Sequence, residues 1–292
     1  MAEEETRPPG LSFSHTYLSF RFKDLCIAMW TVPWVGMWTC FLSALSMHGT
    51  SLNVTKCNVY NFIPSLSAVT GVSPQCYIWR ASVALNGVPR LCVLLGYRSL
   101  FRSSLHGAPA PESQIRPPSP HEGTGDTVAC AKTDHGKVEK VIDVTCVLGL
   151  IEAVAFSGVT FVSNKENYDI HEKFFVTFMT ASLLYMLLTL YLMCRTGLKN
   201  RSSLYARSFA VKRFLFGFII MCTCILLIFF YKHRFLCHDL AFSWFSLSEY
   251  FVAVSNYGFH VTSVWDFPDY YVSLVGPTME PMEAENKKQK NA

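Results

Sequence analysis

Apolar residues gather along this chain in six blocks, each close to the roughly 20 residues that a helix needs to cross a bilayer. The blocks are Leu25 to Met47, Ile78 to Phe101, Val141 to Val162, Phe174 to Cys194, Phe214 to Tyr231 and Ala241 to Val264. The second block is the least regular, because polar residues and a proline interrupt it: Arg80, Asn86, Pro89 and Arg90. The pattern predicts an all-α polytopic membrane protein with a six-helix transmembrane bundle over residues 25–264.

The composition agrees with a membrane protein. Of the 292 residues, 51% are hydrophobic and 14% are aromatic, which is more apolar than an ordinary soluble protein of this size. The net charge of +4 comes from the connections between blocks and indicates contact with anionic lipid rather than with nucleic acid. The chain shows no internal repeat, glycine-rich phosphate loop or nucleophile-elbow motif. The missing repeat, and too few charges in the spans for an obvious ion path, disfavour a transporter or channel.

Lysine and arginine in the connections predict the orientation, because positive charge stays preferentially on the cytoplasmic side of a membrane. With a cytoplasmic N-terminus, the lumenal side receives only Lys56, Lys165, Lys173, Lys232 and Arg234. The cytoplasmic side receives the others, including those assigned to the connection between the fourth and fifth spans: Arg195, Lys199, Arg201, Arg207, Lys212 and Arg213. We therefore expect both termini to be cytoplasmic, as an N-terminal segment 1–24 and a C-terminal tail 265–292.

Two connections differ in character. Residues 103–136 are rich in proline, serine and glycine and predict a disordered cytoplasmic insert between the second and third spans. The first lumenal loop, residues 57–69, mixes aromatic and aliphatic side chains with turn formers. We expect this loop to pack against the bundle.

Processing and sorting signals are also visible. The acidic start of the chain lacks the basic region of a cleavable signal peptide, so the first span is expected to act as a signal anchor. The sequon at Asn53 falls in the first lumenal loop and predicts a glycosylation site, whereas the sequon at Asn200 falls on the cytoplasmic side.

Lys288 and Lys290 fit the dilysine pattern that coat proteins read when they return membrane proteins to the endoplasmic reticulum. The alternative is a merely soluble basic tail.

Three of the eleven cysteines, Cys57, Cys76 and Cys237, fall on the predicted lumenal side, where disulfides can form. The number is odd, so one of the three remains unpaired. No set of cysteines and histidines has the spacing of a metal site, and the sequence predicts neither a metal nor a cofactor.

The sixth block carries polar residues at membrane depth. Asn256 and His260 lie seven and eleven residues after Glu249, so on a helix all three fall within about 20° of one stripe. Groups of this kind usually face a bundle interior or a wet cavity. Glu249 and His260 are about 16 Å apart along the helix axis, so each needs a partner on another element. Candidate partners are Arg90, Glu152, Arg80, His171 and Glu172.

Two interpretations of this set stay open. The buried charges could be structural interhelical pairs, or they could form a site for a lipid headgroup or a reaction. Trp265 and Asp266 close the sixth block and are typical of an interfacial anchor beside a helix-ending acid.

Four segments carry a family resemblance: CNVYNFIPSLSAVTG (Cys57 to Gly71), YIWRASVALNGVPR (Tyr77 to Arg90), YDIHEKFFVTF (Tyr168 to Phe178) and Cys237 to Phe267. Together they resemble the post-GPI attachment to proteins factor 2 family, within the Frag/DRAM/Sfk-type group of multi-span membrane proteins. The resemblance covers all six blocks. It implies a role in lipid remodelling of glycosylphosphatidylinositol (GPI) anchors, namely the reacylation of lyso-GPI with a saturated fatty acid in the Golgi apparatus or endoplasmic reticulum membrane.

The resemblance also implies site residues, although it does not decide between an acyltransferase and its accessory subunit. It assigns catalytic roles to Glu249, His260 and His171, and substrate-binding roles to Arg80, Arg90, Asn256, Glu172 and Asp266. It pairs Cys57 with Cys237 in a disulfide and leaves Cys76 free. Asn86 is a departure, because related sequences commonly have histidine in that segment.

The mechanism that we hypothesise brings a lipid sideways between the helices. Its phosphate and glycan stay near Arg80 and His171, and the polar stripe orients the acyl-glycerol region; arginine suits a phosphate because its planar fork donates paired hydrogen bonds. The expected partners are the GPI-anchor lipid or lyso-GPI, membrane lipids, other GPI-remodelling proteins and retrieval coat proteins. The alternative is a non-catalytic scaffold for a remodelling enzyme, which would dock through the insert, or a DRAM-like membrane regulator.

Overall fold

Within the described residues, helices form the body of the molecule. The computed structural model describes residues 13–55, 57–107 and 135–277. Its long helices are α1 (Phe22–His48), α3 (Gln75–Leu105), α4 (His135–Phe161), α5 (Tyr168–Arg195), α6 (Ser203–Leu236) and α7 (Ala241–Val261). The short ones are η1 (Gly49–Asn53), α2 (Leu66–Thr70), η2 (Leu198–Asn200) and α8 (Ser263–Asp266).

Five of these helices, α1, α3, α4, α5 and α6, are long and apolar enough to cross a membrane. α7 coincides with the sixth predicted block but is not among the five. Large apolar side chains such as Leu85, Val154 and Leu227 point outward and are more than half exposed, as expected for a surface that meets lipid instead of water. The prediction of an all-α polytopic membrane protein is confirmed.

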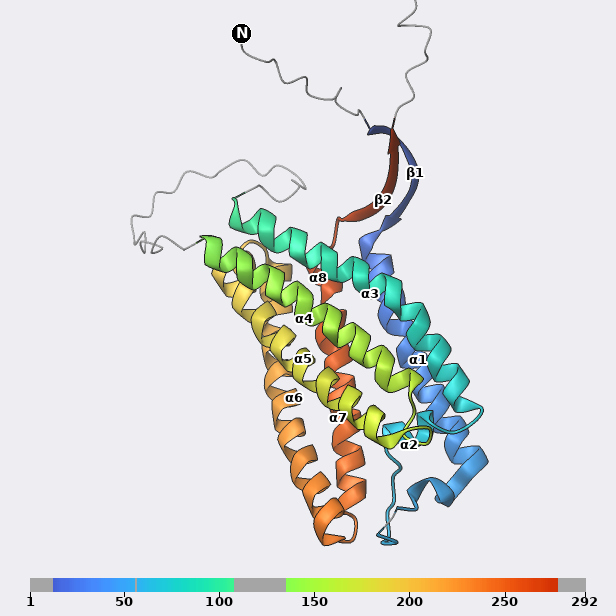
Figure 1. The fold of residues 1–292 in the computed structure, drawn as a ribbon. Coiled ribbons are helices and arrows are strands. Elements are labelled where there is room, and N and C mark those ends of the chain that lie inside the picture. The colour runs from blue at the N-terminus through green and yellow to red at the C-terminus, as the bar shows by residue number, and fades with distance from the viewer. Residues whose placement is uncertain (1–12, 56, 108–134, 278–292) are drawn as a thin grey trace, which may run out of the picture.

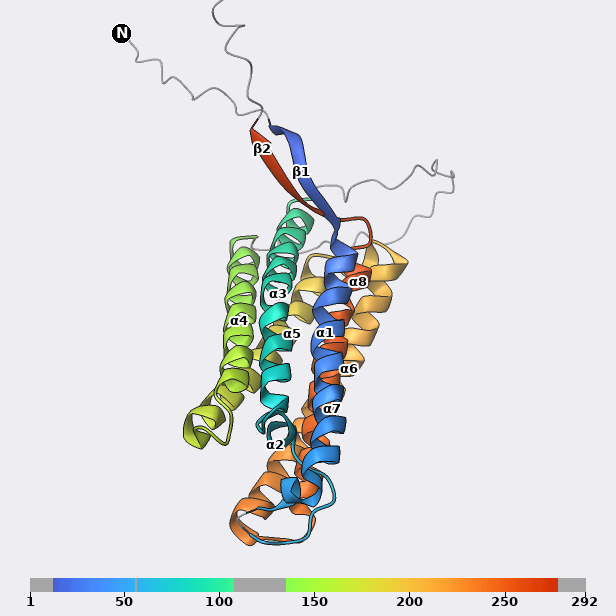
Figure 2. The same ribbon diagram turned by 90° about the vertical axis from the view of Figure 1, so that its right-hand side faces the viewer.

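The helices pack as neighbouring pairs, α1 with α3, α4 with α5 and α6 with α7, and α3 also packs against α4 (Figures 1 and 2). α1 and α3 approach closely at Gly36, where a Cβ atom would collide with Ser82. Small residues at such crossings let helix backbones come together in membranes. The buried interior contains aromatic side chains from several helices, among them Trp30, Trp79 and Phe259.

Three helix ends lie outside the predicted apolar blocks, because α3, α4 and α6 continue beyond them. α6 begins at Ser203, where Ser202 caps it by accepting the Tyr205 N–H at 3.3 Å, and not at Phe214. α3 continues to Leu105 and α4 begins at His135, so both ends of the predicted insert 103–136 are helical. Most of that insert, and also Lys288 and Lys290, lie outside the described residues.

The segments predicted as terminal tails contain a two-stranded sheet. β1 (Phe13–Arg21) pairs antiparallel with β2 (Tyr271–Pro277), with Arg21 opposite Tyr271 and Phe20 opposite Val272. The Phe22 N–H donates to the Tyr270 carbonyl at 2.8 Å, which joins the sheet to the start of α1. The sheet lies at the end of the bundle opposite α2 and the turn between α6 and α7 (Figure 1).

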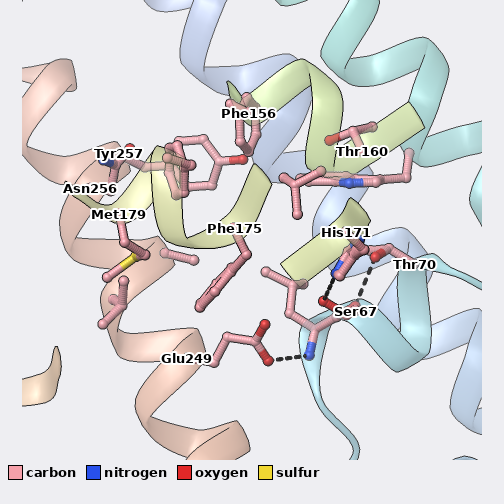
Figure 3. A pocket seen from close by; sticks show the side chains of 16 residues that line it. Ser67, Thr70, Phe156, Thr160, His171, Phe175, Met179, Glu249, Asn256 and Tyr257 are labelled. Atoms are coloured by element: carbon pink, nitrogen blue, oxygen red, sulfur yellow. Dashed lines mark hydrogen bonds between the residues drawn. The ribbon is translucent and has the colours of Figure 1, made fainter. Parts of the chain in front are cut away.

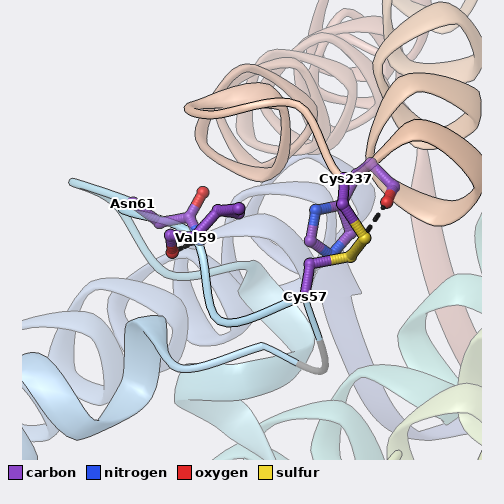
Figure 4. The surroundings of a disulfide bond; sticks show 5 residues. Cys57, Val59, Asn61 and Cys237 are labelled. Carbon is purple, nitrogen blue, oxygen red and sulfur yellow. Dashed lines mark hydrogen bonds between the residues drawn. A yellow bond between two sulfur atoms is a disulfide. The ribbon is translucent and has the colours of Figure 1, made fainter.

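The loop between η1 and α3 packs against the bundle, as predicted, and it contains α2, which contacts α1, α3 and α7. A disulfide joins Cys57 in this loop to Cys237 at the end of α6, across 180 residues of sequence (Figure 4). This is the pair that the resemblance implied, and Cys76 is free. The disulfide fixes the loop that carries α2 to the far end of the α6–α7 pair.

Candidate functional site

A mostly apolar cavity of about 60 Å³ lies between α2, α3, α4, α5 and α7 (Figure 3). Its walls are largely aromatic and aliphatic, with a few polar groups from α2, α4, α5 and α7. The lining residues are Leu66, Ser67, Thr70, Trp79, Phe156, Val159, Thr160, His171, Phe175, Phe178, Met179, Glu249, Val252, Ala253, Asn256 and Tyr257. An apolar cavity with few convergent polar groups is the usual form of a small-molecule site.

Glu249 reaches this cavity from α7 and is buried. Its Oε2 accepts the backbone N–H of Leu66, the first residue of α2, at 2.9 Å. Within the part of the chain that the structure describes, no cationic side chain forms an ion pair with Glu249. The carboxyl group is therefore held by α2, and not by Arg90, which was one of the predicted partners.

His171 enters the cavity from the first turn of α5. Its Nδ1 lies 2.7 Å from the carbonyl oxygen of Val162, and its Nε2 lies 3.0 Å from Ser67 Oγ on α2. The imidazole is thus bonded through both nitrogens. Glu172, the next residue, is exposed and does not line the cavity.

A buried polar network lies beside the cavity and is centred on Glu152 of α4. Its Oε1 accepts from Asn256 at 3.1 Å, lies 3.2 Å from His260 Nε2, and forms an ion pair with Arg90 at 2.8 Å. Asn256 also donates to Ser182 at 2.6 Å, and it lines the cavity, whereas Arg90 and His260 do not. Asn256 therefore connects the network to the cavity.

The predicted polar stripe of α7 faces protein, as expected, because Glu249, Asn256 and His260 are all buried. The His260 ring lies between the rings of Trp30 and Tyr185, at centroid distances of 5.0 and 5.4 Å. Within the stripe, Asn256 and His260 share one partner, Glu152, whereas Glu249 accepts from the Leu66 N–H.

Arg80 and His171 both bind the end of α4. Arg80 donates to the Phe161 carbonyl at 2.9 Å, and His171 bonds the next carbonyl, that of Val162. Arg80 also forms an ion pair with Glu166 at 2.5 Å. The Arg80 hydrogen bond, helped by the backbone N–H and hydroxyl of Ser163, lowers the pKa of Glu166 to about 2. The site predicted for a phosphate already contains one carboxylate.

Asp266 lies apart from the cavity, at the end of α8 and towards the sheet. It accepts from Tyr97 and from Lys212, both at 2.6 Å, and Lys212 also donates to Ser208 at 2.6 Å. Lys212 was assigned to a cytoplasmic connection. That assignment is wrong: the side chain is only 1% exposed and is ion-paired inside the bundle.

The sequence contained a signal for Lys212. The buried positions of α6 are Tyr205, Ser208, Lys212, Ile219, Cys222 and Leu226. Their spacing of three, four or seven residues defines one helical face. Extending the fifth apolar block back to Tyr205 would have placed Lys212 on that buried face. Asn86 is likewise buried on α3, one turn before Arg90, and does not line the cavity.

Long apolar helices around a cavity with buried ionisable groups define a polytopic membrane protein with an internal site. The chain belongs to the Frag1/DRAM/Sfk1/Cwh43P N-terminal domain family, whose model matches residues 21–270. The resemblance drawn from the sequence is thereby confirmed. No solved structure matches the chain.

Curated relatives extend this result. The chain is 40% identical to "Post-GPI attachment to proteins factor 2-like" of Drosophila melanogaster. The match extends over 261 residues, which are 88% of this chain and 73% of the relative. It is 28% identical to "Acyltransferase PGAP2" of Xenopus tropicalis, over 90% of this chain and 94% of the relative. It is 30% identical to "Post-GPI attachment to proteins factor 2" of Caenorhabditis elegans, over 86% and 87% of the two chains.

Proposed function

We propose that this protein takes part in lipid remodelling of GPI anchors by transferring a saturated fatty acyl group to lyso-GPI. The observation that carries the proposal is the cavity. Its apolar walls suit an acyl chain, and three polar side chains reach it, Glu249 and Asn256 from α7 and His171 from α5. The names of the relatives, which refer to GPI attachment and to an acyltransferase, point to the same chemistry.

Within this proposal, the roles follow the position of each residue. His171 and Glu249 are the candidate acid–base groups at the cavity, and Asn256 orients the lipid from the wall that it shares with the Glu152 network. Arg80 donates to the carbonyl of Phe161, next to the carbonyl that His171 contacts, and it would bind the lipid phosphate in place of the Glu166 carboxylate. The roles predicted for His260, Arg90, Glu172 and Asp266 stay predictions, and these four residues lie outside the cavity lining.

The proposed topology has six spans, with α7 as the sixth and both termini cytoplasmic. The antiparallel pairing of β1 with β2 supports an even number of crossings, because it brings the segments before α1 and after α8 to one end of the bundle. The disulfide at the opposite end suits an oxidising lumen. Asn53, at the end of η1 on that side, is the proposed glycosylation site, and the Golgi apparatus or endoplasmic reticulum is the proposed location.

The test is mass spectrometry of GPI-anchor lipids from cells that lack the endogenous family member and receive this chain at matched abundance. We expect the intact chain to restore saturated anchors. Glu249→Ala, His171→Ala and Asn256→Ala should each lower the saturated fraction, because each removes a polar group at the cavity. Ser255→Ala is the matched control, since the Ser255 hydroxyl is buried on α7 but donates to its own helix at Phe251.

A chain that is present at normal abundance and restores no saturated anchors would overturn the proposed function. The scaffold alternative would then take its place. If the variants lose protein and activity together, the side chains act in folding, and the assignment of the cavity is overturned.

A further inference from the structure

The hydroxyl of Ser67 contacts a histidine side chain instead of the backbone of its own helix. Ser246, Ser248 and Ser255 on α7 each donate to a backbone carbonyl one turn earlier, which is the common arrangement for helical serines. Thr70, on the same short helix as Ser67, does likewise with Leu66. The Ser67 hydroxyl instead lies 3.0 Å from His171 Nε2, inside the cavity (Figure 3).

The second bond of His171 determines which nitrogen carries the proton. A carbonyl oxygen can only accept a hydrogen bond, so Nδ1, 2.7 Å from the Val162 carbonyl, carries a proton and donates it. In the neutral imidazole Nε2 is then the lone-pair acceptor, and it faces the Ser67 O–H. A nucleophile bonded to a base, with the base oriented by a third group, is the arrangement that activates serine for acyl transfer.

Both neighbours of Ser67 fix its position. Ser65 caps α2 by accepting the Ala68 N–H at 3.1 Å, and Glu249 accepts the Leu66 N–H at 2.9 Å. The first contact closes the first turn of α2, and the second anchors that turn to α7. The cavity beyond Ser67 is lined by Trp79, Phe175 and Met179, among others, and offers an apolar surface for a hydrocarbon chain.

We propose that Ser67 is a nucleophile that carries the acyl group as an ester, with His171 as its general base; the proposal rests on the proposed acyl-transfer function. In the first step, Ser67 Oγ attacks the carbonyl carbon of an acyl donor and His171 Nε2 takes the hydroxyl proton. The bond to the donor's leaving group breaks, and His171 returns the proton to that group. In the second step, the hydroxyl of a lysolipid gives its proton to Nε2 and attacks the acyl-serine carbonyl. Ser67 Oγ leaves and regains the proton.

The donor is an acyl ester or thioester, and the position of the site favours the ester of a membrane phospholipid. Ser67 lies ten residues after Cys57, in the loop that the disulfide ties to the α6–α7 end. Disulfides persist in oxidising compartments. A donor dissolved in the cytoplasm would have to cross the bundle to reach this end, whereas a phospholipid can enter from the adjacent leaflet.

The experiment uses the purified full chain in phosphatidylcholine nanodiscs, with isotope-labelled acyl chains on the phospholipid in one arm and on palmitoyl-coenzyme A in the other. After an acid quench, mass spectrometry of the peptide that contains Ser67 measures acylation. We expect the labelled acyl group on Ser67 in the phospholipid arm and none in Ser67→Ala. In Ser67→Cys the adduct should become a thioester that neutral hydroxylamine removes. His171→Ala should slow acylation by about 10²–10⁴-fold, the usual contribution of a general base.

Ser248→Ala is the control, because its buried hydroxyl donates to its own helix at Trp244 and its removal should leave acylation unchanged. Acylation in the thioester arm alone would overturn the assignment of the donor. An adduct on another residue, such as Cys76, or equal labelling of Ser67→Ala would overturn the nucleophile.

The anchor-lipid assay in cells separates this inference from the proposed function. If Ser67→Ala restores saturated anchors as well as the intact chain does, the proposed function stands and the acyl-serine is excluded. If the intact chain restores nothing while Ser67 is acylated in nanodiscs, the nucleophile stands and its acceptor is a lipid other than lyso-GPI.

Discussion

Glu152 gathers donors from two other helices onto a single carboxylate. Arg90 approaches from α3, and Asn256 and His260 approach from α7. An unpaired charge at membrane depth is costly, so each donor compensates for the burial of Glu152. At the scale of single residues, this network connects α3, α4 and α7.

Glu152→Leu should destabilise the protein strongly, because it leaves the Arg90 guanidinium buried without its partner. Loss of one member of a buried pair costs about 3–5 kcal/mol, whereas replacing both members by apolar residues is often close to neutral. We therefore expect Arg90→Met/Glu152→Leu to recover most of the thermal stability, measured as the melting temperature in detergent.

The same double variant separates the two interpretations of the network. If it also restores saturated GPI anchors in cells, the pair is structural. Recovery of stability without recovery of saturated anchors would contradict a purely structural pair and would assign Arg90 or Glu152 to the reaction.

The Arg80–Glu166 pair leads to a second prediction, about how the stability of the protein depends on pH. The pKa of Glu166 is lowered from 4.5 to about 2, so its contribution to stability is fully present above pH 4.5 and is lost as the pH falls through 2. The melting temperature of Glu166→Gln should therefore lie below that of the intact chain by a constant amount between pH 7 and pH 5. The difference should shrink at lower pH, and a difference that changes between pH 7 and pH 5 would contradict the assignment.

Residue patterns predicted part of this site. Periodicity placed Glu249, Asn256 and His260 on one protein-facing stripe, and charge neutralisation named Arg90 and Glu152 as partners. Ser67 gave no such signal, because its contact with His171 depends on where a five-residue helix sits against α5. That position is set by tertiary packing and by the Glu249 contact, which local sequence does not encode.

At the scale of elements, hydropathy located the six long helices but not their ends. An apolar block ends where charged residues begin, yet backbone hydrogen bonding continues, as at Ser203 in α6 and Leu105 in α3. The strands β1 and β2 were not predicted, because each pairs with a segment 250 or more residues away in sequence.

Replacing residues 108–134 with a glycine–serine linker of equal length should leave anchor remodelling unchanged. The cavity is lined by α2, α3, α4, α5 and α7, and the replacement keeps α3 and α4 complete. Saturated anchors measured in cells provide the readout, with abundance as the control. Loss of remodelling at normal abundance would favour the scaffold alternative, in which this segment docks another protein.

At the scale of the whole molecule, two connections tie distant parts of the chain together. The β1–β2 sheet joins the segments that flank the bundle, and the Cys57–Cys237 disulfide joins the opposite end. Between them, α7 and α8 supply one side of both buried charge clusters. Asn256 and His260, in the Glu152 cluster, belong to α7, and Asp266, in the Lys212 cluster, belongs to α8.

This dependence on the last helices has a consequence for biosynthesis. Arg90 and Glu152 lie on α3 and α4, so they can neutralise each other while the nascent chain is still being inserted. Lys212 emerges on α6 before Asp266 has been translated, and α6 must wait in the membrane with an uncompensated ammonium group. A premature stop between Leu236 and Asp266 would therefore leave Lys212 on α6 without its carboxylate partner, and we expect the quality control that removes incompletely assembled membrane proteins to degrade the truncated chain.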